Sequence, residues 1–378
     1  MQQLFSGYNS IQSLSEIIQR HCPKRIFLVF DKDSYELSGA QQKISFILTG
    51  RCVTEFSDFE KNPRLEDIIK GIDFFDQSQS DFIIALGGGS VIDMAKSISL
   101  LVAQQKTDLP ACLENKINLV PRKVPLVLIP STAGSGSEAT HFAVIYKDKI
   151  KYSLSHCSLI ADYAILDPFF IETLPAYVAA YTGMDALCQG IESLWSVNST
   201  DISRQYSKKA ISLAIENLAE NVQKPTNRTR ESMLFASYYS GKAINIAQTT
   251  MAHSVSYPLT SYFGIPHGHA VAVTLPYFLL LNTGVTEESL CDRRGVSFVQ
   301  ERIKEIAELF NVSDPEKAAK KFLILMEEVG VEARLGKMGL RPKDLPLIVQ
   351  HGFNPQRAKN NPRTVTEDDL YKLLEIIL

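Results

Sequence analysis

Cysteine is sparse in this sequence, and no two cysteines form a motif. The six cysteines are scattered between Cys22 and Cys291 without a CxxC pair. This pattern argues against a disulfide framework and against a zinc site built on cysteines, and it favours reduced thiols in a cytoplasm. The N-x-Ser/Thr triplets that begin at Asn198, Asn227 and Asn311 are then expected to be chance matches.

Long apolar runs and an excess of positive charge are also missing. No apolar run approaches the roughly 20 residues that span a bilayer, and the opening residues (MQQLFSG) lack the charged start and apolar core of a signal peptide. The formal net charge is −3 without an offsetting basic stripe, which argues against a nucleic-acid partner. Hydrophobic residues make up 45% of the chain, as in an ordinary globular protein. Its 378 residues are more than one hydrophobic core usually serves, so we expect two domains.

The first part of the chain alternates strands with helices. Apolar runs typical of buried parallel strands lie at residues 24–30, 81–86 and 124–129, and helical patterns lie at 65–76 and 91–103. After about residue 170 the strand signal fades, and helical stretches follow at residues 175–195, 201–221, 230–247, 298–309 and 315–329. The sequence therefore predicts an α/β domain with a parallel sheet over residues 1–170 and an all-α domain over residues 171–378.

Small and hydroxyl-bearing residues follow two of the predicted strands. A GGGS run at residues 87–90 precedes a helix predicted from Val91; glycine lets the backbone approach a pyrophosphate there, and the helix N-terminus offers free N–H groups. An STAGSGSE run at residues 131–138 follows the next strand, and Asp31 ends the first. The set favours a dinucleotide across the sheet edge, with a carboxylate at Asp31 that bonds the ribose hydroxyls and repels the 2′-phosphate of NADP. The alternatives are a glycine turn without a ligand and a capping role for Asp31.

Metal-ligating residue types gather in the second half of the chain. Asp185 and Gln189 are four residues apart in a predicted helix and so share one face. His253 and His267 follow, and three of only seven histidines fall within residues 253–269. A carboxylate with two imidazoles suits a divalent first-row metal, with an amide oxygen as a fourth ligand, and such a metal can polarise a carbonyl or stabilise an alkoxide. The alternative is a set of ordinary surface or capping histidines.

Four ordered runs resemble the signatures of the iron-containing (group III) alcohol dehydrogenases: residues 87–96 (GGGSVIDMAK), 130–138 (PSTAGSGSE), 183–187 (GMDAL) and 264–268 (GIPHG). The resemblance covers nearly the whole chain. It implies an α/β dinucleotide-binding domain followed by an all-α metal-binding domain, the dehydroquinate synthase-like architecture. It also implies hydride transfer between NAD(H) and a small alcohol or aldehyde, and a homodimer.

The resemblance further implies which residues form the site. Asp185, His253 and His267 match metal ligands, for Fe²⁺ first and Zn²⁺ or Mn²⁺ as alternatives. Gln189 stands where the family usually has histidine, which predicts a weaker site and puts metal dependence in doubt. Tyr257 stands where the family often has another histidine, and Tyr257 and His269 are the candidates to deliver a proton. The implied cofactor contacts are Asp31, Asn62, Gly88, Gly89, Ser90, Asp93, Ser131, Thr132, Ser135, Thr140 and Lys151.

Residues 185–200 and 253–260 resemble the phosphonoacetaldehyde reductase branch of this family, which makes 2-hydroxyethylphosphonate in phosphonate metabolism. Arg357 and Arg363 are the candidate phosphonate ligands, since the planar fork of arginine suits tetrahedral oxyanions. The alternative for this tail is a solvated charged loop. The alternatives for the whole chain are a general short-chain alcohol dehydrogenase, an enzyme similar to dehydroquinate synthase or glycerol dehydrogenase, and a non-catalytic NAD-binding relative.

Overall fold

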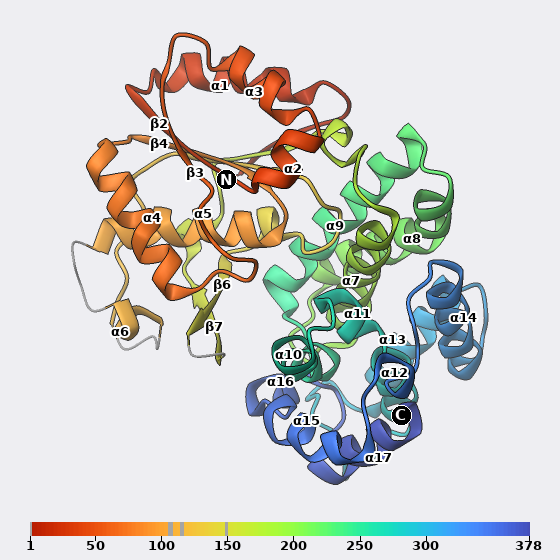
Figure 1. The fold of residues 1–378 in the computed structure, drawn as a ribbon. Helices are drawn as coiled ribbons and strands as arrows, with labels where there is room; N and C mark the ends of the chain where they lie inside the picture. Colours follow the sequence, from red (N-terminus) through yellow and green to blue (C-terminus); the bar gives the residue numbers. More distant parts are fainter. Residues whose placement is uncertain (1, 105–108, 114–116, 148–149) are drawn as a thin grey trace. The chain divides into compact units, whose positions relative to one another are not determined.

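The computed structural model describes residues 2–104, 109–113, 117–147 and 150–378. It contains two compact units (Figure 1): unit 1 is Met1–Thr132 with Gly136–Leu174, and unit 2 is Ala133–Ser135 with Pro175–Leu378. The sequence placed this boundary at residue 170, and the structure places it at Pro175, where proline disfavours helix in the residue before it. In the described ranges, no helix has the length and apolar character needed to cross a membrane.

Unit 1 is built on a parallel sheet of six strands in the order β1-β8-β5-β4-β2-β3. Strands β4 and β5 pair so that Gly87 lies opposite Pro130, and β2 pairs with β4 so that Phe30 lies opposite Leu86. The carboxyl ends of these three strands therefore meet at one sheet edge, where open α/β sheets bind their ligands. The bounds are β1 (Gln3–Ser6), β2 (Arg25–Phe30), β3 (Cys52–Phe56), β4 (Phe82–Gly87), β5 (Leu126–Pro130) and β8 (Tyr163–Leu166).

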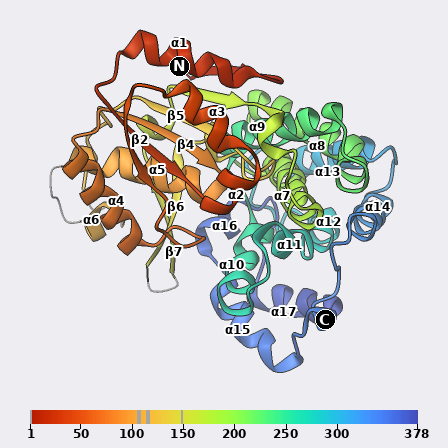
Figure 2. The ribbon, with the colours of Figure 1, turned by 45° about the horizontal axis from the view of Figure 1, so that its top comes forward.

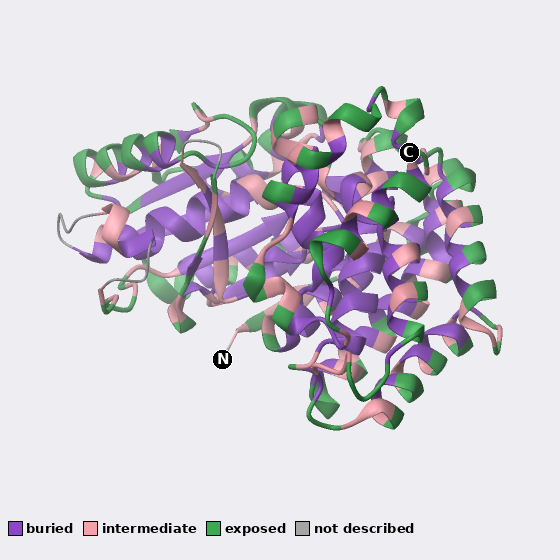
Figure 3. Cartoon of the chain, turned by 90° about the horizontal axis from the view of Figure 1, so that it is seen from below, coloured by how far each residue is buried: buried purple, intermediate pink, exposed green. Residues whose placement is uncertain are grey.

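Two hydrophobic cores cover the two faces of this sheet, because alternate strand residues point to opposite sides. Ile83 and Leu128 belong to the core that includes α4 (Leu65–Ser78), α5 (Gly89–Leu101) and α6 (Leu109–Leu113). Ile84 and Ile129 belong to the core that includes α1 (Ser13–His21), α2 (Lys32–Leu37) and α3 (Ala40–Ile47). Figure 2 shows α1 and α3 on one side of the sheet and α4 and α5 on the other. Strands β4, β5 and β8 are buried throughout. Figure 3 shows how buried residues gather inside the fold and exposed residues on the outer helix faces.

An antiparallel hairpin beside the sheet was not predicted from the sequence. It pairs β6 (Phe142–Lys147) with β7 (Ile150–Ser155). Ala143, Ile145 and Leu154 of the hairpin are buried in the core of the α4 and α5 face, and Tyr152 is partly buried against it. The short strands β1, β3 and β8 were also missed, since four or five residues give too little periodicity to separate a strand from a loop.

Unit 2 is helical in its described residues. Helix α7 (Ala176–Trp195) packs against α8 (Asp201–Gln223), α9 (Asn227–Ala247) and α11 (His267–Ala272). The remaining α-helices are α10 (Met251–Phe263), α12 (Leu275–Thr283), α13 (Val296–Leu309), α14 (Pro315–Glu328), α15 (Leu345–Gly352), α16 (Pro355–Asn360) and α17 (Glu367–Ile377). The predicted succession of a parallel α/β domain and an all-helical domain is confirmed.

Candidate metal centre and cofactor loops

Helices α7, α10 and α11 bring the predicted metal ligands together. One ligand atom each from Asp185, His253 and His267 lies within 4.8 Å of the others. His253 Nε2 lies 3.3 Å from Asp185 Oδ1, and this buried nitrogen makes no hydrogen bond within the described residues. An imidazole nitrogen buried beside a carboxylate oxygen and a second imidazole is a donor set that fits a divalent cation.

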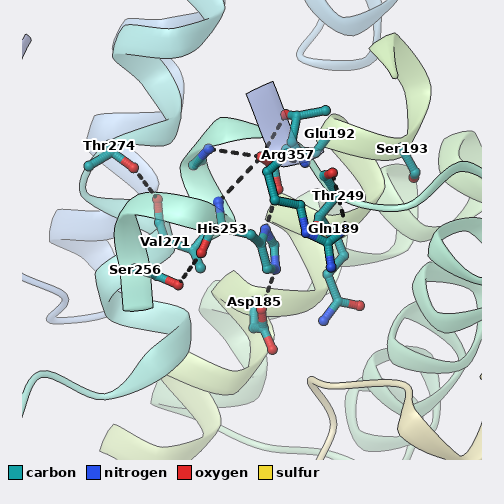
Figure 4. Close-up of polar contacts among 12 residues, drawn as sticks. Asp185, Gln189, Glu192, Ser193, Thr249, His253, Ser256, Val271, Thr274 and Arg357 are labelled. Carbon is teal, nitrogen blue, oxygen red and sulfur yellow. Dashed lines mark hydrogen bonds and ion pairs between the residues drawn. The ribbon is translucent and has the colours of Figure 1, made fainter. Parts of the chain in front are cut away.

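Glu192 fixes the orientation of the His253 ring. The carboxylate is buried one helical turn beyond Gln189, and its Oε2 accepts a hydrogen bond from His253 Nδ1 (Figure 4). Its Oε1 accepts hydrogen bonds from the Thr250 hydroxyl at 2.7 Å and from the backbone N–H groups of Thr250 and Ala252 at 3.1 and 3.0 Å. A carboxylate that holds Nδ1 leaves Nε2 to the metal, the usual support for a metal-binding histidine.

The two carboxylates decide the charge of His253 before a metal arrives. Burial alone lowers the pKa of His253, but Glu192 and Asp185 outweigh burial and raise the pKa to about 9. For Glu192, burial raises the pKa, but His253 and the surrounding donors outweigh it and lower the pKa. The site therefore favours a positive charge between His253 and Asp185, which a metal cation supplies in place of a proton.

Glycine at position 268 lets His267 approach α7. A Cβ atom on Gly268 would lie 1.9 Å from the Tyr181 carbonyl oxygen and 2.9 Å from the Cβ of Asp185, so only glycine permits this contact. His267 Nδ1 lies 3.2 Å from the Ser256 hydroxyl oxygen, and that hydroxyl donates to the His253 carbonyl at 2.6 Å. Nδ1–H of His267 therefore donates to Ser256, which points the acceptor nitrogen of this ring elsewhere.

Gln189 lies on the same face of α7 as Asp185 and is buried. Its Oε1 accepts a hydrogen bond from the Ser240 hydroxyl at 2.9 Å, which leaves one lone pair of this oxygen for a cation. Its role as a fourth ligand stays a prediction.

Gln189→His is expected to tighten binding of a divalent first-row metal by about tenfold, because imidazole is a stronger donor than a neutral amide. Metal titration of the metal-stripped protein measures this change. Gln223→His, on an exposed position of α8, is the matched control and should leave the metal Kd unchanged. Equal metal affinity in Gln189→His and wild type would count against a ligand at this position.

Within unit 1, the GGGS loop lies beside Ser131 and Thr132, the first two residues of the 131–138 loop. The Ser131 N–H donates to the Gly87 carbonyl at 2.9 Å, and a Cβ on Gly88 would lie 3.2 Å from the Thr132 methyl carbon. Helix α5 begins at Gly89 instead of near Val91, so Gly89 and Ser90 form its first turn. The free N–H groups of that turn are suited to an anion.

Asp31 and Asn62 are two further predicted cofactor residues of unit 1, and both make hydrogen bonds within the protein. Asp31 follows β2 and caps α2, where its Oδ1 accepts from the Ser34 N–H at 2.9 Å. The Asn62 N–H donates to the Ser90 hydroxyl at 3.2 Å, and Asn62 has a left-handed backbone (φ 63°). The capping role foreseen as the alternative for Asp31 is therefore real, and a ribose contact by the same carboxylate stays a prediction.

Asp31→Gly should raise kcat/KM for NADPH relative to NADH by about tenfold, because the 2′-phosphate then meets no carboxylate at the end of β2. Steady-state rates with both cofactors give this ratio. The exposed neighbour Asp33 provides the control Asp33→Gly, for which we expect an unchanged ratio. A wild-type preference for NADPH would show that the assignment of Asp31 is wrong.

The remaining predicted cofactor residues lie in several places. Asp93 is already hydrogen-bonded within the protein, and the others lie in the loop, in the turn after it or on β7. Both carboxylate oxygens of Asp93 are engaged, by the Ser137 hydroxyl and by the Val144 N–H. Thr140 lies in the turn after residues 131–138, and Lys151 lies on β7 opposite Tyr146. Ser135 belongs to unit 2, in a segment where Gly134 packs against Thr182.

Comparison with known proteins settles which family has this arrangement. Residues 2–168 match the iron-containing alcohol dehydrogenase family, and residues 179–378 match the C-terminal part of the Fe-containing alcohol dehydrogenase family. The chain belongs to the iron-containing alcohol dehydrogenases. Family membership makes it a NAD-dependent oxidoreductase of the alcohol dehydrogenase type, with Asp185, His253 and His267 as its candidate metal site.

Three relatives illustrate the spread of activities in this family. A probable alcohol dehydrogenase, EutG, of Escherichia coli is 31% identical over 97% of this chain and 91% of its own length. A phosphonoacetaldehyde reductase of Streptomyces viridochromogenes is 34% identical over 78% of this chain and 76% of its own length. The crystal structure of sulfoacetaldehyde reductase from Bifidobacterium kashiwanohense in complex with NAD⁺ matches with a TM-score of 0.90 and 26% identity, over 100% of this chain and 96% of that one. The phosphonoacetaldehyde reductase branch is thus one of several at similar identity.

The structure separates the two candidate proton donors of this family member. Tyr257 lies one turn after His253 on α10, so the two share a helix face. His269 lies two residues after His267 on α11, so the two point in different directions. His269 Nε2 donates to the Glu332 carbonyl at 2.7 Å, and burial lowers the pKa of His269. Tyr257 is therefore the better placed of the two.

The two candidate substrate arginines also differ. Arg357, on α16, donates to the Thr249 carbonyl (Figure 4). The next residue, Thr250, donates its hydroxyl to Glu192. Arg363 lies 3.9 Å from Asp369, at the start of α17. Only Arg357 is linked through described contacts to the residues around the metal group.

Sequence reasoning missed Glu192 and Lys96. Glu192 follows Asp185 by seven residues and Gln189 by three, so helical spacing places all three on one face and could have identified it. Lys96, in the glycine-loop motif, is fully buried. Its contacts with residues 137–142 depend on tertiary structure, and no sequence signal points to them.

Proposed function

We propose that this family member is a cytoplasmic reductase that uses NADH and one divalent metal to reduce a short aldehyde with an anionic group, with phosphonoacetaldehyde as the substrate. The observation that favours an anionic substrate is the position of Arg357. This half-buried cation donates to the Thr249 carbonyl, and the next residue, Thr250, donates to Glu192, which orients His253. Reduced cysteines support the cytoplasmic setting, since no disulfide links the six cysteines, which all lie in described ranges.

The chain contributes binding and orientation to this reaction. A bound metal supplies a Lewis acid that polarises the aldehyde carbonyl, and NADH supplies the hydride. Asp185, His253 and His267 would hold the metal, and Glu192 and Ser256 keep the two rings in the tautomers that present a lone pair.

Further residues would bind the cofactor and the substrate or hold a proton. The first turn of α5 and the loop at residues 131–138 would hold the cofactor pyrophosphate. Tyr257 would hold the proton that the product alcohol requires, at its phenolic oxygen. Arg357 would bind the anionic group of the aldehyde through its planar fork.

The substrate proposal is tested by the selectivity of an arginine variant. Arg357→Ala should lower kcat/KM for phosphonoacetaldehyde by about ten- to a hundredfold, because one charge-assisted hydrogen bond contributes roughly 1.5–3 kcal/mol. The value for propanal, which has no anion, should barely change. Both values are measured by steady-state NADH oxidation.

Arg363→Ala is the companion variant, since sequence alone did not distinguish the two arginines. Its pairing with Asp369 leads us to expect a smaller and less selective loss than at Arg357. Equal losses on both substrates at Arg357, or a wild type that prefers propanal, would contradict the phosphonate proposal. The broader assignment as an alcohol dehydrogenase would stand.

A further inference from the structure

A buried lysine of unit 1 is surrounded by oxygen atoms. Lys96 is fully buried on α5. Its ammonium nitrogen, with three N–H donors, lies within hydrogen-bond distance of four oxygens: the carbonyls of Ser137 and Thr140 at 2.8 and 2.9 Å, the Phe142 carbonyl, and the Thr140 hydroxyl at 2.8 Å. The Ser137 hydroxyl oxygen is a further neighbour at 3.4 Å. All of these oxygens belong to one turn, which joins the 131–138 loop to β6.

Acidic groups compensate this ammonium without binding it directly. Asp93, three residues earlier on α5, accepts from the Ser137 hydroxyl and from the Val144 N–H. Glu138 is also buried, and its Oε1 has no hydrogen-bond partner within the described residues. Burial lowers the pKa of Lys96 to about 8, against the opposing effect of Asp93 and Glu138. A buried charge is costly unless it is paired and hydrogen-bonded, so this ammonium needs the whole set of contacts.

The Lys96 ammonium is surrounded by neutral oxygen atoms, as a small metal cation is, and among the described residues it contacts no carboxylate as it would in an ion pair. Backbone carbonyl and hydroxyl oxygens are the donors that hard cations bind. They come from a segment of six residues, so the ammonium closes this segment into a fixed turn. Because the turn begins with the last two residues of the 131–138 loop, its geometry fixes where that loop ends.

We propose that the Lys96 ammonium acts as a tethered monovalent cation that holds the 137–142 turn, and with it Thr140, in the conformation that binds NAD. Lys96 is a positioning residue in this account, and the account rests on the proposed cofactor site in unit 1. The same set of oxygens becomes a site for a free alkylammonium ion once the lysine side chain is removed.

Chemical rescue of Lys96→Ala tests the proposal on the full-length protein. The atoms removed by this substitution correspond to n-propylammonium. The Kd for NAD⁺, measured by calorimetry, should rise about ten- to a hundredfold, as expected when charge-assisted hydrogen bonds are lost. Millimolar n-propylammonium should restore this Kd, whereas n-propanol, of equal shape without charge, should not. At saturating NADH, kcat should change less than twofold, and bound metal should be unchanged.

Amide hydrogen exchange gives a readout that does not depend on NAD or on activity. Exchange at residues 139–144 should accelerate in Lys96→Ala and slow again with n-propylammonium. Lys70→Ala removes an exposed lysine of α4 and is the matched control, with no change expected. If Lys96→Ala does not fold, Ser137→Ala replaces it, because it removes the hydroxyl between Asp93 and Lys96 and should raise the Kd for NAD⁺ severalfold.

An unchanged Kd and unchanged exchange in Lys96→Ala would overturn the proposal. Equal rescue by n-propanol would also overturn it, since that result shows simple filling of a cavity. A wild type that does not bind NAD⁺, while residues 139–144 still respond to Lys96→Ala and to n-propylammonium, would refute the cofactor site and leave only the effect of Lys96 on the turn.

Discussion

Asp185→Ala should abolish metal binding and lower kcat/KM for aldehyde reduction by at least about a thousandfold. Asp185 supplies the only carboxylate of the described metal group, and loss of a Lewis acid removes several kcal/mol of transition-state stabilisation. His253→Ala and His267→Ala should behave alike. Metal content, kcat/KM with NADH, and the Kd for NAD⁺ are the quantities to measure, and the Kd should stay within about twofold of the wild-type value.

The unchanged Kd separates loss of a ligand from loss of the fold. Asp73→Ala, at an exposed position of α4, is the control and should retain both metal and activity. An Asp185→Ala protein that keeps its metal and its activity would show that the ion binds elsewhere.

Glu192→Gln should weaken metal binding by about ten- to a hundredfold, because an amide holds His253 Nδ1–H less strongly than a carboxylate and lowers the basicity of Nε2. Glu192→Ala should also reduce the free energy of unfolding by about 3–5 kcal/mol, since it leaves His253 and the Thr250 and Ala252 donors without their buried partner. Metal titration and urea unfolding measure the two effects.

Glu327→Gln, on the exposed face of α14, is the control for both measurements and should leave each unchanged. Metal affinity of wild-type strength in Glu192→Gln would mean that the His253 ring is held by packing alone.

The sequence was sufficient where one local pattern determines structure. Apolar runs predicted β2, β4 and β5, because strands buried on both faces are apolar throughout. Helical spacing predicted that Asp185 and Gln189 share a face, and the structure places Asp185 with His253 and His267 as the resemblance implied. The hairpin of β6 and β7 escaped prediction because few of its residues are core residues.

Which group each of these side chains contacts in the fold could not be predicted in the same way. Arg357 and Arg363 look equivalent in the sequence, and only the fold gives one of them Asp369 and the other the Thr249 carbonyl. His267 and His269 look like neighbours in a metal site, but residues two apart on a helix point apart. The sequence also gives no reason for the glycine at position 268. The reason is tertiary, because any side chain there would collide with the Tyr181 carbonyl on another helix.

The most direct test of the central claim is net oxidation of NADH by added phosphonoacetaldehyde or propanal, measured for one preparation with its metal, after chelation, and after return of Fe²⁺, Zn²⁺ or Mn²⁺. We expect stoichiometric formation of alcohol and NAD⁺ with metal, loss of at least about 99% of the rate after chelation, and recovery with at least one of these ions. Full activity in a rigorously metal-free sample, or binding of NADH without turnover of either aldehyde, would contradict it.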